Sequence, residues 1–116
     1  MWFFKKKTER ENILDNKHNI EDMAASIDVL ISIGKDSEEL VDILKEVKDK
    51  IKYFNPTQNK DALEIDKKIA NRIGDLKIDI NKAKSSGDYT KPIASVKDLK
   101  DSMIAERIAK ANRRKN

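Results

Sequence analysis

The chain has 116 residues, of which 38% are apolar and 40% are charged, and it contains no cysteine. This length fits one domain and excludes two ordinary ones, so we expect a single helical domain over residues 1–116. The lack of cysteine excludes disulfides, thiolate chemistry and zinc–sulfur sites. Because the apolar fraction is small for a self-sufficient core, we also expect self-association or a protein partner, and hence an oligomer.

The net charge of +4 is unevenly distributed along the chain. Residues 21–50 contain nine acidic and four basic residues, whereas residues 91–116 contain three acidic and eight basic residues. No apolar run approaches the roughly 18 residues of a membrane span, and the N-terminal aromatic residues precede the lysines, unlike a secretory signal. We therefore expect a cytoplasmic protein that touches a membrane only at its surface.

The first helix signal is the capping-box pattern Thr8-x-x-Glu11, which predicts a helix start near Glu9. Apolar residues then recur at helical spacing, and Gly34 provides the expected C-terminal stop. The expected buried stripe of this helix consists of Ile13, Ile20, Met23, Ile27 and Leu30.

A second helix is predicted after Asp36 and Ser37, whose side chains suit an N-terminal cap. It ends at Asn55, because a residue that precedes proline is pushed out of helical geometry. Its apolar residues follow alternating steps of four and three, which is typical of one buried helix face. They are Leu40, Leu44, Val47, Ile51 and Phe54.

A third helix is predicted from about Gln58 to Lys84, followed by a loop at residues 85–88. Gly74 lies inside this helix, where glycine costs about 1 kcal/mol relative to alanine. We expect Gly74 to allow the close approach of a neighbouring helix. The alternative is a break in the helix, with Asp75 as a new N-terminal cap.

A fourth helix is predicted from Pro92, a residue tolerated in the first helical turn. Short loops make sequential helices antiparallel, so the expected fold is all-α: an antiparallel up-down helical bundle of four helices with coiled-coil-like packing. The alternative is a three-helix core with a looser fourth helix. The apolar residues of the fourth helix are Val96, Leu99, Met103, Ile104 and Ile108.

Both ends of the chain carry clusters that are candidates for contact with a partner. Residues 1–8 form an aromatic-basic arm, and residues 112–116 are expected to form a basic disordered tail. In an up-down bundle, the arm and the tail lie at the same end as Tyr53 and Phe54. The residues expected at this contact surface are Trp2, Phe3, Phe4, Lys5, Lys6 and Lys7, supported by Arg113, Arg114 and Lys115.

Two interpretations of the arm remain open at this stage. Its aromatic residues can fold back onto Tyr53, Phe54 and Pro56, where burying one large aromatic side chain is worth roughly 1.5–3 kcal/mol. Alternatively, the rings enter a membrane interface while the three lysines contact anionic lipid, which contributes roughly 3 kcal/mol in total. The second interpretation makes the arm a weak and reversible membrane contact.

The C-terminal sequence RIAKANRRKN suggests nucleic acid as a further partner. It places five positive charges in the last ten residues, enough for contacts with phosphates. No side chains suited to reading base edges accompany them, so any such binding is expected to be nonspecific. The five residues are Arg107, Lys110, Arg113, Arg114 and Lys115.

An acidic run on the second helix has two possible uses. As a solvated face, it pairs within the helix with Lys45, Lys48 and Lys50. It can also meet the basic fourth helix, which in a simple closed bundle lies only across a diagonal, or a partner that carries a basic helix. The run consists of Glu38, Glu39, Asp42, Glu46 and Asp49.

The residues required by the common enzymatic chemistries do not occur in a suitable arrangement. His18 is the only histidine, so a bundle metal site with converging Glu-x-x-His units is not expected. Asp75 and Asp79 lie one helical turn apart, but nothing distinguishes them from surface charges. The three glycines are isolated, so no phosphate-binding loop is predicted.

The sequence therefore predicts a small non-enzymatic interaction or adaptor module with no cofactor, metal or small-molecule substrate. Its aromatic-basic end is expected to contact a protein partner or an anionic membrane surface. The alternative function is nonspecific nucleic-acid binding through the basic C-terminal tail.

Overall fold

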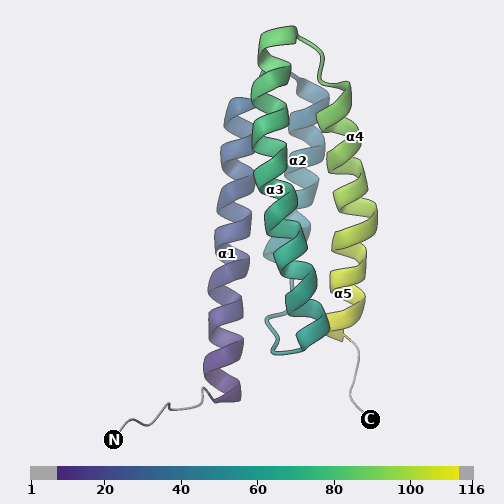
Figure 1. The fold of residues 1–116 in the computed structure, drawn as a ribbon. Coiled ribbons are helices and arrows are strands. Elements are labelled where there is room, and N and C mark those ends of the chain that lie inside the picture. The colour runs from purple at the N-terminus through teal and green to yellow at the C-terminus, as the bar shows by residue number, and fades with distance from the viewer. Residues whose placement is uncertain (1–7, 113–116) are drawn as a thin grey trace, which may run out of the picture.

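A computed structural model describes residues 8–112 of the chain. It shows an all-α bundle with four helical columns (Figure 1). No strand occurs within these residues. The fourth column belongs to the core, because Val96, Leu99 and Ile104 are fully buried. The structure therefore confirms the four-helix bundle and excludes a three-helix core with a loosely attached fourth helix.

The first two helices begin at the predicted caps. α1 spans Glu9–Ile33 and α2 spans Glu38–Lys52. The side-chain hydroxyls of Thr8 and Ser37 each accept a backbone N–H three residues further on, at 3.1 and 3.3 Å. These contacts satisfy donors that the first helical turn leaves without a partner, which fixes where each helix starts.

The third helix, α3, is continuous over Lys60–Ser86 and is capped by the side chain of Asn59. It passes through Gly74 without a break, and a Cβ atom added at Gly74 would meet nothing within 4 Å. Both sequence-based expectations for Gly74 are therefore wrong. This glycine neither admits a neighbouring helix of the bundle nor starts a new helix at Asp75.

The fourth column consists of α4, Thr90–Asp98, then a π-helical segment η1, Leu99–Ile104, and then α5, Ala105–Asn112. Successive residues of an α-helix are about 100° apart around the helix axis. Leu99 and Ile104, five residues apart, would therefore point about 140° away from each other in an uninterrupted α-helix. The wider π turn, with its i to i+5 hydrogen bonds, brings both onto the buried side. The adjacent apolar residues Met103 and Ile104 mark this change of phase in the sequence.

The order of the helices around the bundle differs from the simplest closed arrangement. α1 contacts α2 and α3, and α4 also contacts α2 and α3, whereas α2 and α3 do not contact each other. The connection over residues 53–59 therefore crosses the bundle along a diagonal (Figure 1). As a result, α2 and α4 are neighbours, and the expectation that they face each other only across a diagonal is wrong.

Candidate functional site

One end of the bundle gathers the start of α1, the 53–59 connection and the end of α5 (Figure 1). We call this end the terminal pole. Tyr53 and Phe54 lie at this end, together with the first residues of α1 and the last residues of α5. The contact residues predicted from the sequence, at positions 2–7 and 113–115, lie outside the described residues, and Thr8 and Asn112 are the points at which they attach to the bundle.

The two aromatic residues of the terminal pole differ in exposure. Phe54 is buried in the core, whereas Tyr53 is 81% exposed. A hollow of about 300 Å³ lies beside them, between the end of α2 and α5. Tyr53, Ile108 and Ala111 give it apolar walls, and Asp49 and Lys50 lie at its rim. The hollow has the lining expected of a site for one apolar side chain.

A buried polar network lies directly behind this hollow, with Arg107 of α5 at its centre. The Arg107 side chain is fully buried, and its Nε donates to Asp66 Oδ1 at 2.6 Å. One terminal nitrogen, Nη2, donates to Asn16 Oδ1 at 3.0 Å and to the backbone oxygen of Asn55 at 3.2 Å. The guanidinium also lies over the Phe54 ring, 4.8 Å from its centroid.

Asn16 completes the network from the side of α1. Its Nδ2 donates to Asp66 Oδ2 at 2.8 Å, and its Oδ1 accepts the backbone N–H of Thr57 at 3.1 Å. Together with Arg107, it links α1, the 53–59 connection, α3 and α5. Because a buried charge is stable only when it is paired and hydrogen-bonded, this network fixes the relative positions of these four segments.

The burial of Arg107 corrects the sequence-based interpretation of the C-terminal charges. Arg107 was expected among five residues available to phosphates, but its guanidinium is enclosed in the core and paired with Asp66. A missed signal lay in the buried stripes. Asn16 fills the gap between Ile13 and Ile20 at helical spacing, and Arg107 follows Ile104 by three residues.

The acidic residues of α2 pair with lysines of neighbouring helices. Lys97 and Lys100 of the fourth column lie 3.7 and 3.0 Å from Glu39 and Glu46. The hydrogen bond from Lys100 to Glu46 raises the pKa of the lysine. Lys48, expected to pair within α2, instead contacts Asp28 of α1 at 2.8 Å. Glu39 and Glu46 of the acidic run therefore join α2 to the fourth column.

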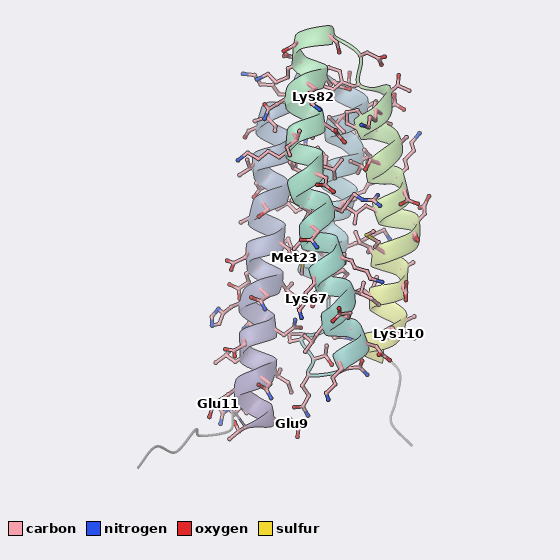
Figure 2. All side chains as sticks on the ribbon, viewed as in Figure 1. Glu9, Glu11, Met23, Lys67, Lys82 and Lys110 are labelled. Atoms are coloured by element: carbon pink, nitrogen blue, oxygen red, sulfur yellow. The ribbon has the colours of Figure 1, made fainter. Side chains whose placement is uncertain are left out.

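A second and larger hollow, of about 390 Å³, lies between α1 and α3 on the side away from α2. Figure 2 labels Met23 and Lys67, which line it, between the ribbons of α1 and α3. Leu63, Ala70 and Ile73 contribute its apolar lining from α3. We call this side of the bundle the α1–α3 face.

The described residues contain no arrangement typical of a metal or acid–base site. Between residues 8 and 112, no three His, Cys, Asp or Glu residues lie close enough together to hold a metal ion. Asp79 contacts Lys91 at 3.5 Å, so it forms an ion pair and not a carboxylate pair with Asp75. None of the helices in this part of the chain is both long and apolar enough to cross a membrane.

Comparisons with known proteins return no match: no family model, no curated protein and no solved structure is similar to this chain. The features of this chain that bear on its function are the terminal pole, the buried network and the distribution of charge over the bundle.

Proposed function

We propose that this protein is a non-enzymatic interaction module that contacts an anionic membrane surface with its terminal pole. The observation that supports this proposal is the common location of the helix ends: α1 begins and α5 ends at that pole (Figure 1). The arm with Lys5–Lys7 and the tail with Arg113–Lys115 are thus attached to the same end of the bundle.

The chemistry of the two attached segments favours anionic lipid over other partners. Each basic residue near an anionic surface contributes about 1 kcal/mol, and tryptophan and phenylalanine are suited to the headgroup region. The two segments together carry six positive charges and three aromatic side chains. This combination supports reversible attachment to a membrane without a spanning helix.

Nonspecific nucleic-acid binding is the weaker candidate. It depended on five charges near the C-terminus, and the burial of Arg107 leaves four of them for phosphate contacts. A tail of this kind predicts binding that decreases steeply with salt and is insensitive to base sequence.

The fluorescence of Trp2, the only tryptophan, tests the proposal in the full chain. We expect a blue shift on addition of phosphatidylserine-containing vesicles, little change with purely phosphatidylcholine vesicles, and loss of the shift at high salt. A shift with duplex DNA alone would instead assign nucleic acid, and a shift with polyglutamate alone would assign an acidic protein. Trp2 that is already shielded from quencher in the free monomer would show that the arm serves the fold.

Two variants separate the contributions of the arm and the tail. Replacing Trp2, Phe3 and Phe4 with alanine is expected to abolish vesicle binding, as measured by sedimentation with vesicles, while helicity stays unchanged. Deleting residues 113–116 is expected to weaken it. The matched control replaces Lys35, Lys82 and Lys84, exposed lysines near the opposite end of the bundle, and is expected to bind as the natural chain does. Equal binding by all variants would contradict the proposal.

A further inference from the structure

Ion pairs cross three of the four sides of the bundle, and the α1–α3 face is the exception among residues 8–112. An exposed pair stabilises only weakly, but its position shows which sides have satisfied their charges within one chain. The pairs are Lys48–Asp28 between α1 and α2, Lys97–Glu39 and Lys100–Glu46 between α2 and the fourth column, and Arg72–Asp98 and Lys91–Asp79 between α3 and α4.

The charges of the α1–α3 face are separated by helix. Over its whole length α1 contains six acidic and two basic residues, whereas α3 contains seven basic and five acidic residues. Some of these charges, such as Asp28 and Arg72, pair on other sides of the bundle.

Across the hollow, Asp22 stands on the α1 wall and Lys67 on the α3 wall. Lys67 also lies 3.8 Å from Glu64 of its own helix, an exposed pair of little stabilising value, and the nearby Asp66 is already paired with Arg107. The apolar lining from Met23, Leu63 and Ile73 lies between Asp22 and Lys67. At the level of the hollow, the face thus has the acidic Asp22 at its α1 edge, an apolar centre, and the basic Lys67 at its α3 edge.

We propose that the α1–α3 face binds a second copy of this chain in a two-fold symmetric dimer. A two-fold axis parallel to the bundle places α1 of one copy opposite α3 of the other, and the same contact is then made twice. A two-fold axis across the bundle would instead place α1 against α1, with acidic edges in contact. Charge complementarity therefore selects the first arrangement, in which the two bundles point the same way.

The size of the face is sufficient for a stable dimer. α1 and α3, with 25 and 27 residues, are about 37 and 40 Å long. With neighbouring helices 8–10 Å apart, the outward side of the pair covers roughly 800 Å². Standard protein interfaces bury about that area per partner, with an apolar centre and a polar rim.

The proposed dimer places both terminal poles at the same end of the assembly. Two arms and two tails then face one surface, which increases the overall affinity without any new contact within a pole. The dimer itself depends only on α1 and α3, so its test is independent of membrane binding. A monomer that binds vesicles would overturn the dimer alone, and a dimer that ignores vesicles would overturn the proposed function alone.

Light scattering of the full chain across micromolar concentrations tests the association. We expect a particle of twice the 13.3 kDa mass of one chain. Asp22→Lys places a lysine opposite Lys67 of the partner subunit, and we expect it to weaken dimerisation at least tenfold. Lys67→Asp is expected to do the same, and the double variant to restore the dimer, because it exchanges the two edges. Circular dichroism of each variant below its dissociation concentration checks that the bundle is intact.

Two changes on α2 provide matched controls. Asp42→Lys and Lys45→Asp reverse the same charges at exposed positions outside the α1–α3 face, and both are expected to leave the dimer unchanged. A monomeric natural chain would overturn the proposal. A dimer that tolerates both single reversals at positions 22 and 67, or that the double variant fails to restore, would overturn it as well.

Cross-linking tests the direction of the dimer, and the lack of natural cysteines makes it selective. Asn19→Cys and Ala70→Cys each introduce one thiol at an exposed position on opposite walls of the hollow. A mixture of the two variants is expected to give dimers with a short bismaleimide, and neither variant alone is expected to do so efficiently. Efficient cross-linking of the Asn19→Cys variant with itself would show α1 against α1 and contradict the proposed axis.

Discussion

Gly74, inside α3, and Gly87, at its C-terminal end, are expected to change the stability of the fold in opposite directions when each is replaced with alanine. Gly74 has a helical neighbourhood and open space where a Cβ would lie, so Gly74→Ala is expected to stabilise the fold by about 1 kcal/mol. Gly87 has a φ of +80°, a left-handed conformation that costs an L-residue roughly 1–2 kcal/mol. Urea unfolding of both variants measures the difference, and stabilisation by Gly87→Ala would contradict it.

Arg107 is the residue whose loss is expected to cost the most stability. Arg107→Met leaves the buried carboxylate of Asp66 without its cation, which typically costs about 3–5 kcal/mol. Arg107→Lys keeps the charge but lacks the fork that reaches Asp66, Asn16 and Asn55 together, so it is also expected to destabilise. Urea unfolding followed by circular dichroism gives both values.

The double variant Asp66→Leu/Arg107→Met shows how much of the cost of Arg107→Met comes from leaving Asp66 buried without a cation. Because it removes both buried charges, it is expected to be more stable than Arg107→Met alone. The matched control, Lys110→Met, changes a partly exposed cation one turn further along α5 and is expected to cost less than about 1 kcal/mol. A small effect of Arg107→Met would show that the network contributes little to the fold.

Composition and spacing predicted the core but not the network within it. Asn16, Asp66 and Arg107 occupy positions where a periodic stripe favours an apolar side chain, and polar residues at such positions are usually assigned to the surface. Their burial depends on partners from four segments of the chain. Those partners meet only in the folded bundle, so spacing along a single helix marks these positions as inward-facing but does not show which residues pair there.

At the scale of the elements, the π-helical segment η1 accounts for one extra residue in the fourth column. Val96, Leu99, Ile104 and Arg107 are buried at steps of three, five and three. Deleting the exposed Ser102 shortens the middle step to four, which an α-helix satisfies. We therefore expect this deletion to leave the fold intact. Deleting the exposed Asn71 from α3 changes the phase of half a regular helix, and we expect thermal denaturation to show a severe loss of stability.

Asp88, which lies just before α4, is expected to make the free energy of unfolding depend on pH in the acid range. Hydrogen bonds from the side chain and backbone of Thr90 lower the pKa of Asp88 below its ordinary value of 3.8. The stabilisation is therefore complete above pH 3.8 and is lost as the pH falls through the lower, folded-state pKa. Asp88→Asn keeps an acceptor but does not ionise. The stability difference between the natural chain and this variant is expected to shrink between pH 5 and pH 2, and a constant difference would contradict the assignment.

Helix boundaries were the most predictable feature of the elements because their signals are local. Thr8 and Ser37 cap the helices that they were expected to cap, and Gly34 follows the end of α1. The π-helical segment was not predicted. It places Ile104 and Arg107 on the buried side of the fourth column, whereas the spacing of Met103 and Ile104 had been assigned to a single α-helical stripe.

At the scale of the whole molecule, the length of each connection determines which helices become neighbours. Residues 34–37 and 87–89 form short connections, and each joins helices that contact each other. The seven residues 53–59 are long enough to cross the bundle, and α2 and α3 are not in contact. Sequence spacing predicted antiparallel sequential helices but not this diagonal step, because a seven-residue loop is compatible with both arrangements.

The helix order can be tested by cross-linking within one chain. Glu46 of α2 and Lys100 of the fourth column lie 3.0 Å apart at their charged ends, so Glu46→Cys/Lys100→Cys is expected to react with a short bismaleimide and keep the mass of a single chain. In a bundle ordered α1, α2, α3, α4, these positions would be diagonal and out of reach. The control pair Glu46→Cys/Asn71→Cys joins α2 to α3, and we expect it to react poorly. The opposite pattern would show that α2 packs against α3, and the ion pairs between α2 and α4 would then not form.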